Sequence, residues 1–256
     1  MILLSLNRSL QFSILQFSNP SILQFFNSPI LQFFNPSILQ FSMLHIKSFM
    51  FNLLQENTYV VSDDTKACVV IDCGAYYQAE RDALVNYIND NGLQPVHLLA
   101  THGHFDHNFG IDTIFDNYGL KVEISNDDDD LISDLPNQFQ SMIGVPLRRQ
   151  YPPVGRFFEN DEVISFGHHQ LKVLKTPGHT RGGVSFYCEE EKTVFTGDTL
   201  FKMSVGRTDF EGGSYEQLME SLHDVLGQLP GETVVYSGHG PKTTIAEELL
   251  YNPYLQ

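Results

Sequence analysis

Short apolar runs separated by polar turns dominate the chain from residue 43 onward. They predict strands at about 45–52, 57–62, 67–72, 96–100, 171–175, 193–196 and 233–236. Helices are predicted at about 78–91, 214–226 and 243–251, with a further helix after Asn108. Strands and helices therefore alternate along most of the chain, which indicates the α/β class.

The stretch 126–160 is less regular. Asp127 to Asp130 form a run of carboxylates, interpreted as the solvated start of a helix, where the helix dipole favours negative charge. Four prolines predict a loop-rich segment that forms one wall of a substrate cleft. Arg148 and Arg149 lie in it, and two interpretations stay open for them, solvated surface and contact with an anionic substrate.

Residues 1–42 have a different composition. Ile-Leu-Gln-Phe recurs beginning at Ile14, Ile22, Ile30 and Ile38, and polar residues and prolines interrupt every repeat. These interruptions break the continuous apolar core that a signal peptide or membrane helix needs, and the unit is too short for a solenoid. We expect residues 1–42 to be a low-complexity segment, either disordered or translated from repeats upstream of a true start at Met43.

Composition and charge exclude some partners. The formal net charge is −16 at pH 7, and Arg8 is the only charged residue before Met43. An acidic surface disfavours nucleic acid and anionic membranes, so neither is expected as a partner. The three cysteines, Cys68, Cys73 and Cys188, show no metal-binding or redox spacing. Such a small odd number suits a reducing compartment and predicts a cytoplasmic protein.

The segment Thr101-His-Gly-His-Phe-Asp-His107 follows directly after a predicted buried strand. In extended backbone, residues two apart face the same side, so His102, His104 and Asp106 are expected to converge while His107 points elsewhere. Asp106 and His107 together can reach a second ion beside the first. Imidazole and carboxylate groups suit zinc, iron and manganese without any thiolate ligand.

Three further ligand candidates occur in the same local setting. His179, Asp198 and His239 each follow a strand-like run through a turn that contains glycine. Rigid strands position the loops at their ends, and ligands gather there. A single histidine is more often a core or surface residue than a ligand, and we interpret His45, His97, His168, His169 and His223 in this way. The ordered conjunction of the other seven residues predicts a site for two divalent metal ions.

At these residues the sequence resembles the metallo-β-lactamase superfamily, and within it the glyoxalase II-like hydrolases, from about His45 to the C-terminus. The resemblance implies a four-layer αββα sandwich in which residues 43–256 form a metallo-hydrolase domain. It also implies a ligand set: His102, His104 and His179 for the first metal, and Asp106, His107 and His239 for the second, with Asp198 bridging both. Asp198 stands where the long-known zinc β-lactamases place a cysteine, which argues against antibiotic hydrolysis. Asp72 matches an aspartate that supports the metal loop from behind, although a turn-capping role is an open alternative.

Other motifs refine this resemblance. The segment Gly206-Arg-Thr-Asp-Phe210 is similar to small single-domain glyoxalase II-like proteins and to persulfide dioxygenases, and it makes Arg207 a candidate substrate contact. The last residues are similar to the end of the glutathione-binding region of glyoxalase II. However, Gln256 replaces an arginine there, and the separate helical domain of that enzyme is missing. Glutathione thioesters are therefore not the favoured substrates.

The implied chemistry is thioester hydrolysis. Two metals, expected to be zinc with iron or manganese as alternatives, lower the pKa of water to about 7 from roughly 15.7 and so provide a shared hydroxide. Asp198 holds the pair in register, and Asp106 orients the nucleophile. A small thioester suits this site because a thiolate, whose parent thiol has a pKa near 8.5, leaves without a general acid.

Two alternatives belong to different classes of function. A persulfide dioxygenase with a single iron shares the Gly206 to Phe210 motif, but such enzymes differ around Ser237 to Pro241 and carry a cysteine where Gly183 stands. A binding protein that has lost its catalytic activity is the other alternative. Every expected ligand position is filled, which opposes it.

Overall fold

Two six-stranded β-sheets form the centre of the fold. A computed structural model describes residues 43–256, and the expectations for residues 1–42 lie outside the described residues. The first sheet has the order β1 (His45–Phe51), β2 (Glu56–Ser62), β3 (Ala67–Ile71), β4 (Gln94–Leu99), β5 (Glu123–Ile124) and β6 (Arg156–Phe157). The second has the order β14 (Thr243–Thr244), β13 (Val234–Ser237), β10 (Thr193–Gly197), β9 (Val184–Cys188), β8 (His169–Lys175) and β7 (Val163–Phe166). A small hairpin consists of β11 (Leu200–Phe201) and β12 (Ser204–Val205).

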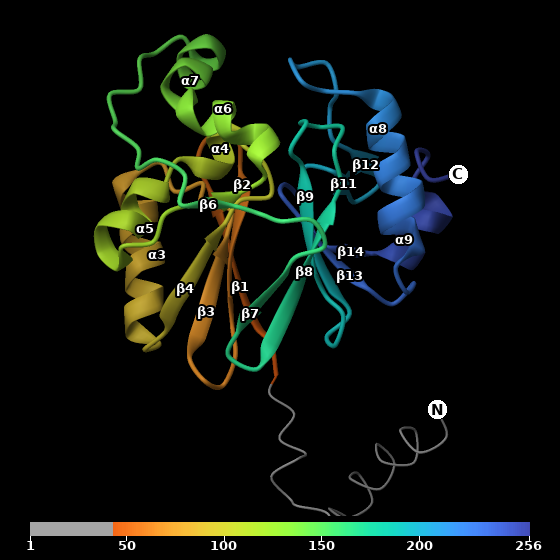
Figure 1. Cartoon of the computed structure of the whole chain (residues 1–256), viewed down its shortest axis with the longest axis horizontal. Helices are drawn as coiled ribbons and strands as arrows, with labels where there is room; N and C mark the ends of the chain where they lie inside the picture. The colour runs from red at the N-terminus through yellow and green to blue at the C-terminus, as the bar shows by residue number, and fades with distance from the viewer. Residues whose placement is uncertain (1–42) are drawn as a thin grey trace, which may run out of the picture. The chain divides into compact units, whose positions relative to one another are not determined.

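Helices cover the outer face of each sheet (Figure 1). The first sheet is flanked by α3 (Gln78–Asp90), α4 (Phe105–Asn108), α5 (Ile111–Tyr118), α6 (Asp129–Ser133) and α7 (Leu135–Ile143), with a 3-10 turn η4 (Asn126–Asp128). The second sheet is flanked by α8 (Tyr215–Glu220), η5 (Ser221–Val225), η6 (Leu226–Gln228) and α9 (Ile245–Tyr251). These four layers are the predicted αββα sandwich, which is confirmed.

Three apolar clusters separate the four layers. Consecutive strand residues point to opposite faces, so Val60 packs toward the helices of the first sheet while Val61 packs between the two sheets. In the second sheet, Phe195 belongs to the cluster between the sheets and Val194 to the cluster beneath α8. Because both faces of the central strands are buried, these strands appear in the sequence as continuous apolar runs.

The structure contains a strand or helix at each predicted position, but it also contains strands that were not predicted, namely β5, β6, β7, β9, β11 and β12. Other segments differ from the prediction. The stretch predicted to be loop-rich contains η4, α6 and α7, and Pro136 stands in the first turn of α7, where its missing N–H costs nothing. The helix predicted to begin at 243 begins at Ile245, because Thr243 and Thr244 pair with β13. No helix among residues 43–256 is long and apolar enough to cross a membrane.

Candidate metal centre

Four strand ends meet at one edge of the sandwich and carry all seven predicted ligands. The segment after β4 holds His102 and His104 and continues into α4, while the turns after β8, β10 and β13 hold His179, Asp198 and His239. The turn after β10 needs glycine at 197. Its φ is +50°, and a Cβ there would lie 2.2 Å from the hydroxyl oxygen of Thr101. Close approach of the two sheets at this point brings their loops together.

The first group of donors consists of His102, His104 and His179. One ligand atom from each lies within 4.8 Å of the others. Nδ1 of His104 and Nε2 of His179 face each other at 2.9 Å. His102 is buried, and its Nε2 has no hydrogen-bond partner among the described residues. Three ring nitrogens therefore converge on one point, as a metal ion requires.

The second group consists of Asp106, His107 and His239. Nε2 of His239 lies 3.3 Å from Oδ2 of Asp106 and 3.3 Å from Nε2 of His107. The expectation that His107 points away from the other ligands is wrong. The extended segment ends at His104, and the short helix α4 turns Asp106 and His107 toward the same edge, with the His107 amide donating to the His104 carbonyl at 3.2 Å.

Asp198 lies between the two groups. Its Oδ1 is 3.3 Å from Nε2 of His107, and its Oδ2 is 3.5 Å from Nε2 of His179 and 3.6 Å from Nε2 of His239. Within residues 43–256, Oδ1 is buried without a hydrogen-bond partner. Leaving such an atom unsatisfied costs about 1–3 kcal/mol, more for a charged group, so the donor set fits bound cations.

Hydrogen bonds from the protein fix the orientation of four of the five imidazoles. Nδ1 of His107 donates to Oδ2 of Asp72 at 2.8 Å. The hydroxyl of Thr101 also donates to Asp72, at 2.8 Å, so it accepts the hydrogen bond from Nδ1 of His102 at 3.0 Å. Asp72 therefore aims two rings, one directly and one through Thr101, and each Nε2 lone pair points into the site.

Two backbone carbonyls complete this orientation. Nδ1 of His179 donates to the carbonyl of Arg207 at 2.7 Å, and Nδ1 of His239 donates to the carbonyl of Leu54 at 3.0 Å. Sequence reasoning missed Leu54 and Thr101, since a carbonyl carries no residue signature and a hydroxyl beside a histidine is common. The Arg207 side chain lies outside the ligand cluster, where it pairs with Asp209 and covers the Phe210 ring at 3.8 Å.

Burial and neighbouring charges set the protonation of the cluster. Burial lowers the pKa of His102 well below its ordinary value, and burial and then His179 lower the pKa of His104 to about 4. For His107, burial acts to lower the pKa, but Asp198 and other carboxylates raise it well above the ordinary value. Burial acts to raise the pKa of Asp198, but His107 holds it well below the ordinary value. Metals bind to neutral imidazoles and ionised carboxylates, which are the forms favoured for His102, His104 and Asp198, whereas His107 has to release a proton when a cation binds.

A buried glutamate behind the site also escaped sequence reasoning. Carboxylate and ring atoms of Glu56, Asp72 and His107 lie within 4.8 Å of one another, and Glu56 accepts a hydrogen bond from Thr58 at 2.9 Å. Burial raises the pKa of Glu56 well above its ordinary value, against the opposing charge of His107. The sequence offered no signal for it, because Glu56 directly precedes the predicted strand 57–62 and its burial appears only in the folded structure.

Comparison with known proteins identifies the family. The profile of the metallo-beta-lactamase superfamily matches residues 51–239. The chain belongs to this superfamily. Its coarse function is therefore that of a metal-dependent hydrolase, as predicted.

Individual relatives point to several activities. Hydroxyacylglutathione hydrolase GloC of Haemophilus influenzae is 35% identical over 213 residues, covering 83% of this chain and 98% of GloC. The crystal structure of the B3 metallo-beta-lactamase BLEG-1 has a TM-score of 0.77 and 33% identity, over 83% of this chain and 100% of the other. TTHA1623 in a di-iron-bound form has a TM-score of 0.73 and 35% identity, over 82% and 100%.

Proposed function

We propose that this protein hydrolyses small thioesters with two divalent metal ions. The observation that carries the proposal is the position of Asp198, whose two carboxylate oxygens lie 3.3–3.6 Å from ring nitrogens of both donor groups. In this assignment His102, His104 and His179 hold the first ion, and Asp106, His107 and His239 hold the second. Asp198 bridges them.

The donor set suits zinc, with iron or manganese as alternatives, because only imidazole and carboxylate ligands are offered. Divalent ions in such a site lower the pKa of water to about 7 and polarise an acyl carbonyl. The relative TTHA1623, described in a di-iron-bound form, supports the expectation of two metals without deciding their identity.

The protein's own residues hold the reacting groups in place. Four imidazole rings are prevented from rotating by hydrogen bonds. His102 donates to Thr101 and His107 to Asp72, while His179 and His239 each donate to a backbone carbonyl. Asp106, with Oδ2 3.3 Å from His239, presents a carboxylate that accepts a hydrogen bond from the nucleophile. We assign to Asp72 the role of orienting His107 and, through Thr101, His102, in preference to the alternative of capping a turn.

A thioester substrate is favoured because the carboxylates of the site cannot donate a proton to a leaving group. Asp106 and Asp198 act as ionised ligands, which only accept hydrogen bonds and carry no proton for a leaving group. A thiolate leaves without that proton because its parent pKa is near 8.5, whereas an alkoxide or amide does not. The name of the relative GloC, a hydroxyacylglutathione hydrolase, supports the same class.

Arg207 remains the candidate contact for an anionic part of the substrate. Its backbone supports His179, and its half-exposed guanidinium lies on Phe210, whose ring is 5.9 Å from the ring of His104. The GRTDF segment thus borders the first donor group. Gln256 does not replace the missing arginine, because its amide donates to the Leu250 carbonyl of its own terminal segment.

We expect two metal ions per chain. Both donor groups are complete, and the bridging carboxylate ties them together, so loading should reach two ions at saturation. Elemental analysis of the reconstituted protein measures this ratio directly. A ratio that never exceeds one, at any metal excess, contradicts the binuclear assignment.

Glutathione is expected to add little to substrate recognition. With Gln256 in place of an arginine, the charged hydrogen bond to a carboxylate of glutathione is lost. Such a loss costs about 1.5–3 kcal/mol, or roughly ten- to a hundred-fold in specificity. The kcat/KM of S-lactoylglutathione is to be compared with that of a glutathione-free thioester of the same acyl group. A preference for the glutathione compound above about a hundred-fold means that the chain has a tripeptide site.

One substrate panel separates the competing activities. It contains thioesters, lactones, glutathione persulfide with oxygen uptake as the readout, and a β-lactam, since BLEG-1 is named a metallo-beta-lactamase. We expect free thiol from the thioesters as the dominant product. Oxygen consumption with persulfide identifies the mononuclear iron alternative, and dominant β-lactam turnover contradicts the thioester proposal.

A further inference from the structure

One aspartate of the acidic run 127–130 is buried against both loops of the first donor group. Asp128 is 1% exposed, so the interpretation of this whole run as solvated is wrong. Its Oδ2 accepts hydrogen bonds from the Gly103 amide at 2.9 Å and the Thr180 hydroxyl at 2.7 Å. Its Oδ1 accepts one from the Gly182 amide at 2.7 Å. All three donors lie within three residues of a proposed metal ligand.

These donors come from opposite halves of the sandwich. Gly103 stands between His102 and His104, in the loop that leaves the first sheet after β4. Thr180 and Gly182 follow His179, in the loop that leaves the second sheet after β8. The Asp128 carboxylate therefore joins the two segments whose imidazoles must meet to form one site.

The packing around Asp128 leaves little freedom for either loop. A Cβ on Gly103 would lie 2.5 Å from Cβ of Leu131, and a Cβ on Gly182 would lie 2.7 Å from Cγ of Asp128. Both loops thus pass close to the segment 128–131. Glycine is needed at these two positions because of this contact.

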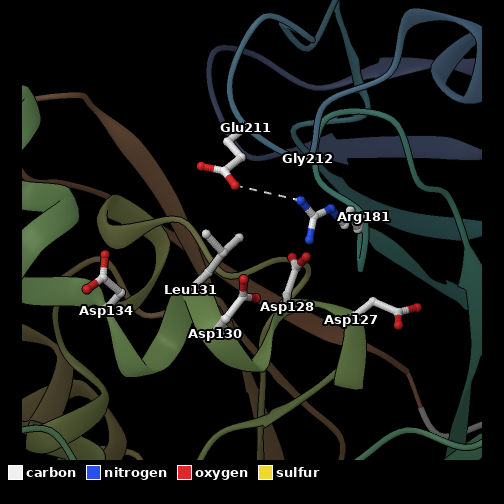
Figure 2. A pocket seen from close by; sticks show the side chains of 8 residues that line it. All are labelled: Asp127, Asp128, Asp130, Leu131, Asp134, Arg181, Glu211 and Gly212. Carbon is white, nitrogen blue, oxygen red and sulfur yellow. Dashed lines mark ion pairs between the residues drawn. The ribbon is translucent and has the colours of Figure 1, made fainter.

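The neighbouring acidic residues differ from Asp128. Asp127, Asp130 and Asp134, like Asp128 itself, line a cavity of about 230 Å³ opposite Arg181, which pairs with Glu211 at 3.9 Å (Figure 2), but these neighbours differ from Asp128 in burial and in hydrogen bonding. Asp130 is exposed, and no hydrogen bond in the described part of the chain joins its carboxylate to either metal loop. Asp130 therefore provides a matched control for Asp128, because its replacement removes the same charge without breaking a hydrogen bond to a metal loop.

We propose that Asp128 is a positioning residue for the first metal site, holding the His102–His104 loop against the His179 loop. This inference rests on the ligand assignment in the proposed function, and not on the substrate. Asparagine at 128 keeps the shape but replaces one acceptor oxygen with an amide donor. If that amide faces Gly182, the Gly182 hydrogen bond is lost; if it faces Gly103 and Thr180, the Gly103 hydrogen bond is lost. In either orientation the connection between the two loops loses at least one of its three hydrogen bonds and the negative charge that strengthens the others.

The experiment measures zinc affinity in proteins that keep one site each. His239→Ala leaves the first donor group complete, and His179→Ala leaves the second. Zinc is titrated against a chromophoric chelator with and without Asp128→Asn in each background. We expect Asp128→Asn to weaken binding about ten- to a hundred-fold with His239→Ala, as for other supporting partners of metal ligands, and less than about threefold with His179→Ala. Asp130→Asn should change neither affinity.

Two results contradict the proposal. One is unchanged affinity in both backgrounds. The other is an equal loss in both backgrounds together with a lower melting temperature of the metal-free protein, which indicates a general folding role. If the wild type binds two zinc ions but cleaves no thioester, the proposed function fails while this inference stands. A wild type that binds no zinc overturns both.

A second variant tests the connection itself. Thr180→Val removes one of the three hydrogen bonds and should weaken the first site in the same direction, by less than Asp128→Asn. The double variant Asp128→Asn/Thr180→Val should lose less than the product of the two single losses, because both changes break one interaction. Multiplicative losses mean that the two residues act independently, and the proposal is then wrong.

Discussion

Replacing Asp198 by alanine is expected to abolish hydrolysis and to weaken both metal sites. The carboxylate lies within 3.3–3.6 Å of ring nitrogens in both donor groups, so in the proposed assignment its removal takes one ligand from each ion. It also leaves His107, His179 and His239 facing one another without the charge between them. We expect kcat/KM to fall by roughly 10³-fold or more, beyond the ~10–100-fold typical of residues that only support a ligand.

Two measurements check this expectation, the kcat/KM for a thioester and the metal content after dialysis against a chelator. Asp224→Ala is a suitable control because it removes an exposed carboxylate from η5. Near wild-type turnover of Asp198→Ala with both ions retained would show that the bridging ligand has been assigned wrongly.

Gly206→Ala is expected to damage the site almost as severely, although position 206 contributes no side chain to it. A Cβ at this position would lie 1.8 Å from the carbonyl oxygen of Asp198 and 3.1 Å from Nδ1 of His179. The backbone must move by an ångström or more, either at the bridging ligand or at Arg207, whose carbonyl orients His179. A displacement of about 1 Å near reacting groups can cost about a hundred-fold in rate, so we expect a loss of that order.

The matched control is Gly231→Ala, where the nearest atom to an added Cβ is 3.3 Å away, on the Ala246 side chain. This variant should retain most of the activity. Thermal unfolding of both metal-free variants separates a local displacement from a loss of fold. Wild-type kcat/KM and metal content in a folded Gly206→Ala protein would mean that this loop can shift without cost.

Much of the fold was predictable because the responsible signals are local. Val60 with Val61, and Val194 with Phe195, are apolar on both faces of their strands, and this pattern is visible in the sequence as short continuous runs. Errors occurred where tertiary contacts override local preference. Thr243 belongs to the edge strand β14, which pairs with β13, although the residues that follow it favour a helix.

The sequence by itself determined the types of the candidate ligands, their order and their position at strand ends, since these depend on residue identity and on the turn residues beside them. Only the tertiary structure decided which way each ligand faces. His107 turns inward because α4 begins at Phe105, and Asp128 is buried although the other aspartates of its run are exposed or half-buried.

In the sequence, Asp128 is indistinguishable from Asp127 and Asp130, apart from sharing a helical spacing with the buried Ile132 and Leu135. Its three partners come from loops 25, 52 and 54 residues away in the chain. Contacts between such distant segments depend on how two sheets pack against each other. That packing is a property of the whole core, which no local pattern in the sequence records.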